Sequence, residues 1–364
     1  PVNILLVGTD SADGIDPDDP IHIGRDIDPQ GRHNADSISV LRLDPRSGQA
    51  WVMSIPRDLY VDVPDGPPSR INATLLTGGP ELLIRTINET FDIEINHYVV
   101  LDFLAFREVV DKLGGVPVWF ENQTRSRRSG LEILTPGCNV LDGGAALQYV
   151  RARTDYQEFI DGEWTRTASS DFDRIERQQD FLVLTIDRAI QRGARSPRVL
   201  ASLVEAGAQS VELDQALTIA EIADLGTSFT SFDGESLARF TPRVTTEYTR
   251  DGTYIGEVLI PEVNDELYAI FRGEADGLLR TDVGFDIVAS SDVDLQNDAD
   301  LLAGLGFVVG SVGLLDAAGD ESVVVHPPGE RGAAVPVSYT HLRAHETKTR
   351  IAVCGGGGKK RGGG

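Results

Sequence analysis

The feature that most constrains this chain is an alternation of strand and helix patterns through its first 272 residues. Short apolar or alternating runs predict strands at 2–8, 37–43, 50–55, 97–101 and 116–120. Helical apolar spacing predicts helices at 79–91, 102–113, 143–150 and 171–191, with two more over 195–225. This alternation predicts an α/β fold, in which an α-β-α layered domain is built around a central mixed sheet.

A change of composition predicts a second domain. After about residue 275 the chain becomes rich in Asp, Gly and Val, and FDIVAS, DLQNDADLLAGLG and FVVGSVG follow one another as strand, helix and strand. We therefore expect a main domain over 1–272 and a small, incomplete C-terminal α/β domain over 273–337.

Both ends of the chain differ from what a native protein would show. SYTHLRAHET at 338–347 corresponds to one reading frame of a common sequencing adapter, so 338–364 is expected to be non-native. At the other end, Pro1 leads directly into a buried-strand pattern. We expect that native residues precede it, including a membrane anchor or signal segment.

The composition excludes several classes of function. The chain has 33 Lys+Arg and 57 Asp+Glu, for a formal net charge of -24, which argues against a general nucleic-acid binder. Two cysteines exclude a disulfide-rich scaffold. The sequence also lacks a P-loop, a dinucleotide-binding glycine motif and a serine-hydrolase elbow.

Arginine stands out in this acidic chain. Arg57 follows a strand in SIPRD, and Arg151 and Arg153 alternate in YVRAR. On the helix predicted at 171–191, Arg174 lies three residues before Arg177 and four before Gln178, so the three side chains share one face. Because guanidinium groups bind phosphate oxygens in a bidentate way, the arginines are candidate phosphate ligands.

Two aspartates complete a candidate site. Asp10 and Asp36 each lie at a strand edge, and carboxylates of this kind hold Mg²⁺ beside phosphates. Arginines and aspartates together would suit a Mg²⁺-pyrophosphate. Each motif taken alone nevertheless favours a simpler interpretation, an exposed helix face whose arginines are solvated or pair with Glu176 and Asp180. The spacing by itself leaves both interpretations open.

Seven segments in order carry a resemblance to a known family. They are NILLVGTD, ADSISVLRLDP, SIPRDLYVDVP, RINATLLTGGP, HYVVLDFLAFREVVDKLGGVPV, LDGGAALQYVRAR and DFDRIERQQDFL. Over about residues 1–272 the chain resembles the LytR-CpsA-Psr family of cell-wall glycopolymer ligases, and the small domain after 275 resembles the one that often follows this module.

The resemblance implies an activity and a location. It implies a Mg²⁺-dependent (or Mn²⁺-dependent) phosphotransferase. Such an enzyme moves a glycopolymer from a polyprenyl-pyrophosphate carrier to a peptidoglycan hydroxyl, typically the C6 hydroxyl of a muramic acid sugar, and forms a phosphodiester. The implied partners are the lipid-linked donor, the wall acceptor and the membrane. The implied location is the extracytoplasmic face of the bacterial membrane, next to the cell wall.

The resemblance also implies roles for single residues. Asp10 and Asp36 match the metal-binding pair. The pyrophosphate-binding set corresponds to Arg57, Arg151, Arg153, Arg174 and Gln178, and the catalytic set to Arg57, Arg174 and Asp171. Arg177 is expected to be structural or supporting. Asp171 or Asp58 could accept the acceptor's proton, and we favour Asp58 as the residue that orients Arg57.

Some positions depart from the family. Asn34 stands where the family often has arginine, and Arg32 is a candidate substitute. The long segments between Asp10 and Asp36 and over 154–170 are expected to border the acceptor groove. The lipid tail requires an apolar tunnel, and ordinary core packing explains its candidate lining residues equally well: Ile84, Ile87, Phe103, Leu104, Phe106, Val109 and Leu182.

Two other functions remain compatible with the same residues. One is a non-catalytic module that binds polyprenyl phosphates or glycans and regulates wall assembly. The other is a pyrophosphatase, in which water attacks the same lipid in place of a sugar hydroxyl.

Overall fold

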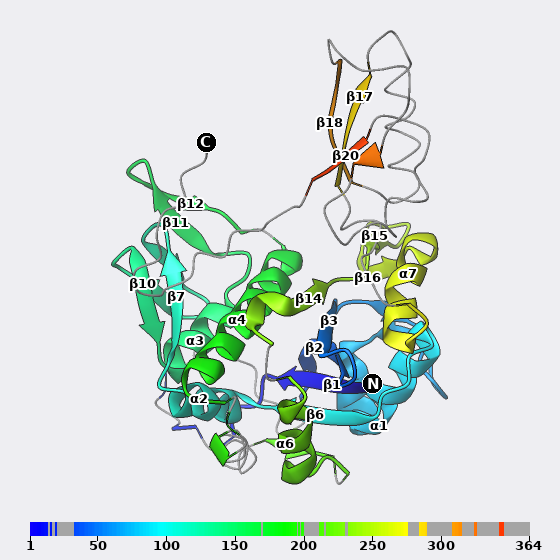
Figure 1. The fold of residues 1–364 in the computed structure, drawn as a ribbon, viewed down its shortest axis with the longest axis horizontal. Coiled ribbons are helices and arrows are strands. Elements are labelled where there is room, and N and C mark those ends of the chain that lie inside the picture. The colour runs from blue at the N-terminus through cyan, green and yellow to red at the C-terminus, as the bar shows by residue number, and fades with distance from the viewer. Residues whose placement is uncertain are drawn as a thin grey trace. The chain divides into compact units, whose positions relative to one another are not determined.

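A computed structural model describes most of the main domain and four strands beyond it (Figure 1). The described residues are 1–13, 15–16, 19, 33–168, 170–194, 196, 198–199, 211–214, 216–229, 232–275, 284–289, 308–314, 324–325 and 342–345. Arg32, the helix predicted at 294–306 and most of the helix predicted from 195 lie outside these residues. The chain divides into two compact units, one built on Pro1–Ile260 and the other on Pro261–Ile351.

A six-stranded mixed sheet forms the centre of the first unit (Figure 1). Its strand order is β13 (Glu212–Leu213), β6 (His97–Leu101), β1 (Val2–Thr9), β2 (Ala35–Asp44), β3 (Gln49–Ile55) and β14 (Leu237–Phe240). β1 pairs antiparallel with β2 and parallel with β6, and β14 pairs parallel with β3. The predicted mixed α/β architecture is therefore confirmed.

Helices cover the sheet because its strands bury side chains on both faces. Ile38 and Val40 of β2 are buried and point away from Ser37 and Ser39, since side chains alternate along a strand. α1 (Asn72–Phe91) contacts β2. α2 (Phe103–Lys112), α3 (Gly143–Arg151) and α4 (Asp171–Gln191) pack together, and side chains from all three meet the serine face of the sheet.

The structure corrects one local prediction and adds a hairpin that the sequence analysis did not predict. The helix expected at 79–91 begins at Asn72, with a break at Gly78 and Gly79, whose backbone angles are not helical. After this break the chain resumes the helix at Pro80, because proline is tolerated in the first turn of a helix. The polar segment at 154–170 contains a hairpin, β11 (Gln157–Ile160) and β12 (Glu163–Arg166).

Smaller sheets surround the central one. β11 and β12 continue into β8 (Thr124–Ser126) and β9 (Leu131–Ile133), which gives a four-stranded sheet. Three two-stranded sheets pair β7 (Val116–Phe120) with β10 (Gly137–Leu141), β4 (Tyr60–Val61) with β5 (Ser69–Arg70), and β15 (Val244–Tyr248) with β16 (Tyr254–Leu259). α6 (Ile219–Thr227) overlaps the end of the stretch at 195–225 in which two further helices were predicted.

The second unit contains a helix and a sheet. α7 spans Pro261–Arg272, and four strands form the sheet: β17 (Gly284–Ala289), β18 (Val308–Leu314), β19 (Val324–Val325) and β20 (Leu342–His345). β17 and β18 agree with the strands expected from FDIVAS and FVVGSVG. β20 falls within 338–364, and the non-native origin of that segment stays a prediction. Among the described residues, no helix combines the length and apolar character needed to span a membrane.

Candidate phosphate site and apolar cavity

Asp36 reaches the site from a β-bulge. Gly8 pairs with Ser37 and Thr9 pairs with Ala35, so Asp36 is the extra residue between two paired positions. A bulge bends the strand and re-aims its side chain. At Gly8 an added Cβ would come within 3.2 Å of the Ser37 Cβ, which explains the small residue beside the bulge.

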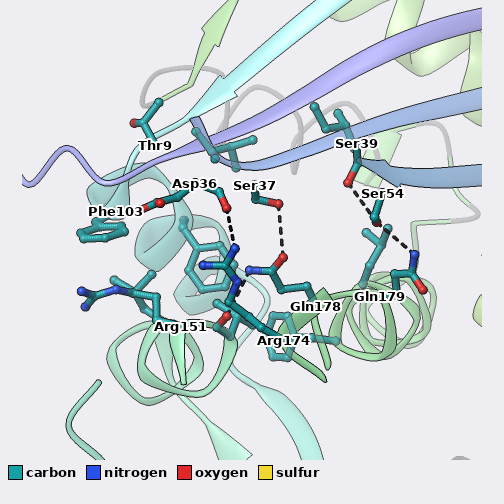
Figure 2. A pocket seen from close by; sticks show the side chains of 18 of the residues that line it. Thr9, Asp36, Ser37, Ser39, Ser54, Phe103, Arg151, Arg174, Gln178 and Gln179 are labelled. Atoms are coloured by element: carbon teal, nitrogen blue, oxygen red, sulfur yellow. Dashed lines mark hydrogen bonds between the residues drawn. The ribbon is translucent and has the colours of Figure 1, made fainter. Parts of the chain in front are cut away.

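α4 carries the second set of side chains at the site. Ser170 and Asp173 form a capping box that fixes the first turn of the helix, and Asp171 is the first helical residue. Arg174 follows one turn later and is only 5% exposed. Figure 2 shows Arg174 and Gln178 directed from this helix toward the ends of β1 and β2.

Three arginines and two aspartates meet there. Arg57, which follows β3, donates a hydrogen bond from Nη1 to Asp36 Oδ1. Arg174 Nη2 donates to Asp171 Oδ2 at 3.0 Å and to the backbone carbonyl of Asp36 at 3.0 Å. Arg153 Nε lies 3.0 Å from Asp171 Oδ1, and Arg57 Nε lies 4.0 Å from Asp171 Oδ2. The structure thus brings together Arg57, Arg153, Arg174, Asp36 and Asp171, all singled out in the sequence.

The cluster holds more donors than its own acceptors satisfy. The buried Nε atoms of Arg57 and Arg174 each lack a hydrogen-bond acceptor, and Arg153 Nε and Asp171 Oδ1 form an ion pair at 3.0 Å without an aligned hydrogen bond. A buried donor without a partner destabilises a protein by about 1–3 kcal/mol. Two such donors beside a third arginine indicate a site built for an anion with several oxygens.

The electrostatics of the two central arginines differ. Burial opposes the charge of Arg57, but Asp36, Asp171 and Asp58 overcome this and raise its pKa. Burial lowers the pKa of Arg174 to about 10; Asp171 opposes this effect, while Arg57 and Arg153 add to it by repulsion. Arg174 therefore stays protonated at neutral pH under a repulsion that a bound anion would relieve.

An apolar cavity opens beside the arginines. It has a volume of about 700 Å³ and lies between the sheet and helices α2, α3 and α4 (Figure 2). Its apolar wall includes Leu6, Val52, Leu101, Phe103, Phe106, Val109, Val110, Leu147, Val150, Phe181 and Leu182. Of the proposed tunnel residues, Phe103, Phe106, Val109 and Leu182 line it, whereas Ile84, Ile87 and Leu104 do not.

Gln178 and Arg151 line the same cavity without joining the central cluster. Ser37 donates to the Gln178 side chain at 3.3 Å, and Gln178 Nε2 donates to the Val150 carbonyl at 3.1 Å. Arg151 lies over the Phe103 ring, 4.4 Å from its centroid. Figure 2 shows Arg151 beside Phe103, at the side of the cavity opposite Gln179.

Arg177 has a different environment from Arg174. Its Nη1 donates to the Ala152 carbonyl at 2.7 Å, and its guanidinium lies 4.2 Å from the Tyr156 ring centroid. It is not among the residues that line the cavity. These are packing contacts, and the structural or supporting role expected for Arg177 stays a prediction.

Asp10 lies apart from the cavity lining. Its carboxylate is 38% exposed and lies 3.3 Å from His33 Nδ1, while Asp36 faces the arginines. Among the described residues, no group of three His, Cys, Asp or Glu side chains is arranged around a common metal position. Two carboxylates at one sheet edge still fit Mg²⁺, which takes most of its ligands from water and substrate phosphates.

The sequence pointed to Asp58 as a residue that orients Arg57, but it did not point to Arg70, which contacts Asp58 in turn. Asp58 Oδ2 lies 3.8 Å from Arg57 Nε, and Arg70 Nη1 lies 3.6 Å from Asp58 Oδ1. Arg70 in turn donates to the Ile255 carbonyl of β16 at 2.9 Å. This series of contacts holds Arg57 in place. It ends on β16, which is distant from Arg57 in the sequence, so sequence patterns alone could not have shown it.

Comparisons with known proteins agree with this arrangement. The family model described as the LytR_cpsA_psr family matches residues 1–269. A probable cell wall biosynthesis protein, LcpB of Corynebacterium glutamicum, is 36% identical over 52% of this chain and 42% of its own length. The polyisoprenyl-teichoic acid–peptidoglycan teichoic acid transferase TagU of Oceanobacillus iheyensis is 32% identical over 42% of this chain and 43% of its own length.

The solved structures show the same fold. TagV of B. subtilis superimposes with a TM-score of 0.59 at 22% identity and covers 76% of this chain and 98% of that one. The chain spans less than half the length of the curated relatives named above. Because the family match runs through the strands and helices that carry the arginine and aspartate cluster, this chain belongs to the LytR-CpsA-Psr family.

Proposed function

We propose that this protein transfers a glycopolymer from a polyprenyl-pyrophosphate carrier to a hydroxyl group of peptidoglycan. The observation that carries the proposal is a cluster of three arginines, Arg57, Arg153 and Arg174, that lines an apolar cavity and in which the Nε atoms of Arg57 and Arg174 have no acceptor. A lipid pyrophosphate has this dual chemistry, since its two phosphates are anionic and its tail is apolar. The names of TagU and LcpB, which refer to teichoic acid transfer and cell wall biosynthesis, support this assignment.

The arginines would bind the pyrophosphate and stabilise the charge that develops in the reaction. The acceptor oxygen attacks the glycan-bearing phosphorus, and a phosphodiester forms as the bridging P–O bond breaks. Polyprenyl phosphate leaves with the bridging oxygen. Arg57, Arg153 and Arg174 are already held by Asp36 and Asp171, so their donors need little reorganisation.

A carboxylate must accept the proton of the acceptor hydroxyl. Asp171 is our candidate, because its Oδ1 atom receives no aligned hydrogen bond. Asp58 contacts Arg57 and Arg70, which suits a positioning role. Asp10 and Asp36 would hold Mg²⁺, which supplies positive charge next to the phosphate oxygens when bound.

Purified protein and a lipid-linked glycan donor test the proposal. With Mg²⁺ and peptidoglycan present, we expect polyprenyl phosphate release and a glycan–peptidoglycan phosphodiester in equal amounts. Arg57→Ala and Arg174→Ala should lose both products while their circular dichroism spectra stay unchanged. Wild-type turnover by either variant would refute the mechanism.

The same assay separates the two other functions. A regulatory binder would retain the lipid and release nothing. A pyrophosphatase would release polyprenyl phosphate at the same rate with or without peptidoglycan, and no glycan would become attached to the wall polymer.

A further inference from the structure

A turn between two strands forms a polar part of the cavity wall outside the arginine cluster. The turn at 127–130 joins β8 to β9, and two of its residues, Arg128 and Ser129, line the apolar cavity. Its last residue, Gly130, has a φ of 82°, a left-handed conformation that glycine adopts without strain. The Gly130 N–H donates to the Ser126 carbonyl at 2.9 Å, and this hydrogen bond closes the turn.

Asp155 holds this turn close to the arginine cluster. Its carboxylate accepts hydrogen bonds from Ser126 Oγ at 2.9 Å and from the Arg128 backbone N–H at 2.8 Å. Asp155 lies two residues after Arg153, whose Nε is 3.0 Å from Asp171 in the cluster. Two residues of chain span no more than about 7 Å. One short segment, which lines the same cavity, therefore carries both a member of the cluster and the residue that holds the turn.

The Ser129 hydroxyl is the observation that points to a ligand. The Ser129 side chain is 9% exposed, and its buried Oγ atom has no hydrogen-bond partner. The backbone N–H of the same residue is satisfied, since it donates to Ser126 Oγ at 3.4 Å. A buried hydroxyl group without a partner destabilises a protein, so its presence requires an explanation. In a cavity wall, a bound molecule can supply the missing partner.

The groups left unsatisfied in this turn are suited to an anion. Among the described residues, none forms an ion pair with the exposed Arg128 guanidinium, which has N–H donors and no acceptor. Both oxygens of the Asp155 carboxylate already accept hydrogen bonds. A second cation, Arg151, lines the same cavity beside Phe103. A ligand that satisfies a free guanidinium and a hydroxyl group together must bring acceptor oxygens, and a phosphate brings several.

We propose that Arg128 and Ser129 form a second phosphate subsite, in which both side chains donate hydrogen bonds to phosphate oxygens of the lipid-linked donor. The inference rests on the proposed transfer reaction, whose pyrophosphate substrate carries oxygens on two phosphorus atoms. Arg57, Arg153 and Arg174 would hold one phosphate, and the turn would hold the other. Donors at both phosphates would stabilise the charge that develops as the bridging P–O bond breaks.

Two adjacent arginines provide a matched test. Arg127 and Arg128 are both exposed, but of the two only Arg128 lines the cavity. In the full chain, Arg128→Gln should weaken binding of farnesyl phosphate or of N-acetylglucosamine 1-phosphate at least tenfold, measured by calorimetry, because a charged hydrogen bond is lost. Arg127→Gln should bind both probes like the wild type. Weaker binding of farnesyl phosphate assigns the lipid-side phosphate to the subsite, and weaker binding of the sugar phosphate assigns the sugar-side one.

Ser129→Ala separates a role in binding from a role in folding. Because the deleted hydroxyl group has no partner, this variant should unfold at or above the wild-type temperature, yet bind the affected probe about three- to tenfold more weakly. Arg128→Gln should also keep the wild-type unfolding temperature, since the Arg128 backbone, and not its side chain, bonds to Asp155.

None of these measurements requires glycan transfer. Probe binding that depends on Arg128 in a protein without transferase activity would refute the proposed function and support the subsite. The proposal would be overturned by unchanged affinity for both probes in Arg128→Gln, by equal weakening in Arg127→Gln, or by a lower unfolding temperature of Ser129→Ala.

Discussion

Arg174 and Arg177 offer a matched comparison, because both are buried arginines on one face of α4. The pKa of Arg174 falls from 12.5 to about 10, mainly through burial and then through the effects of nearby charges. A fall of this size corresponds to about 3 kcal/mol of unfavourable free energy in the charged form. Replacing Arg174 with methionine removes this unfavourable free energy. It also removes the hydrogen bond from Arg174 to the Asp36 carbonyl, and leaving that carbonyl without a donor costs about 1–3 kcal/mol.

These two effects oppose each other. We therefore expect Arg174→Met to stabilise the protein by no more than about 2 kcal/mol. Arg177→Met loses a charged hydrogen bond to the Ala152 carbonyl and a stacking contact with Tyr156. We expect it to destabilise the protein by about 2–4 kcal/mol.

Thermal unfolding with and without inorganic pyrophosphate measures both effects. Each kcal/mol shifts Tm by about 2–4 °C in a unit of this size. At one hundred times its Kd, pyrophosphate should stabilise the wild type by about 2.7 kcal/mol, and Arg174→Met should lose that gain. Equal destabilisation by the two variants, or a full pyrophosphate shift in Arg174→Met, would show that Arg174 is a structural residue and refute the reasoning.

Three further predictions concern other parts of the protein. Asp36→Asn should raise the Mg²⁺ concentration needed for half-maximal transfer at least tenfold, measured by metal titration; an unchanged requirement would remove Asp36 from the metal site. Phe106→Trp should narrow the cavity and weaken binding of long polyprenyl phosphates more than short ones in a lipid-binding assay; equal loss for both would argue against a tail in the cavity. The third concerns Asp214, which accepts hydrogen bonds from the backbone N–H groups of Tyr98 and Ala216 and lies 3.1 Å from His97 Nδ1. Burial raises the pKa of Asp214, but these contacts outweigh burial and lower it. Its contribution is present above the unfolded-state pKa of about 3.9 and is lost as pH falls through the lower folded-state value. Asp214→Asn should therefore lower Tm at pH 7 but not in strongly acidic solution, and a pH-independent loss would exclude this linkage.

The sequence predicted the central part of the fold well where its patterns are regular. β1, β2, β3, β6 and α4 agree with the expected positions because each carries a regular pattern of apolar residues over at least five positions. β13 and β14 escaped prediction because two to four residues do not establish a period. β14 belongs to the sheet through its parallel pairing with β3, a contact between residues far apart in the chain.

The sequence by itself determined which chemical groups are available: arginines after β3, at the end of α3 and on α4, with aspartates beside β1 and β2. Only the tertiary structure decided how they are used. It brought Arg57, Arg153 and Arg174 around Asp171, placed Asp36 in a bulge and left Arg177 to pack on tyrosines. Two arginines three residues apart look equivalent in a sequence. Their roles diverge because a helix turn faces different neighbours at each step, and burial and nearby charge depend on those neighbours.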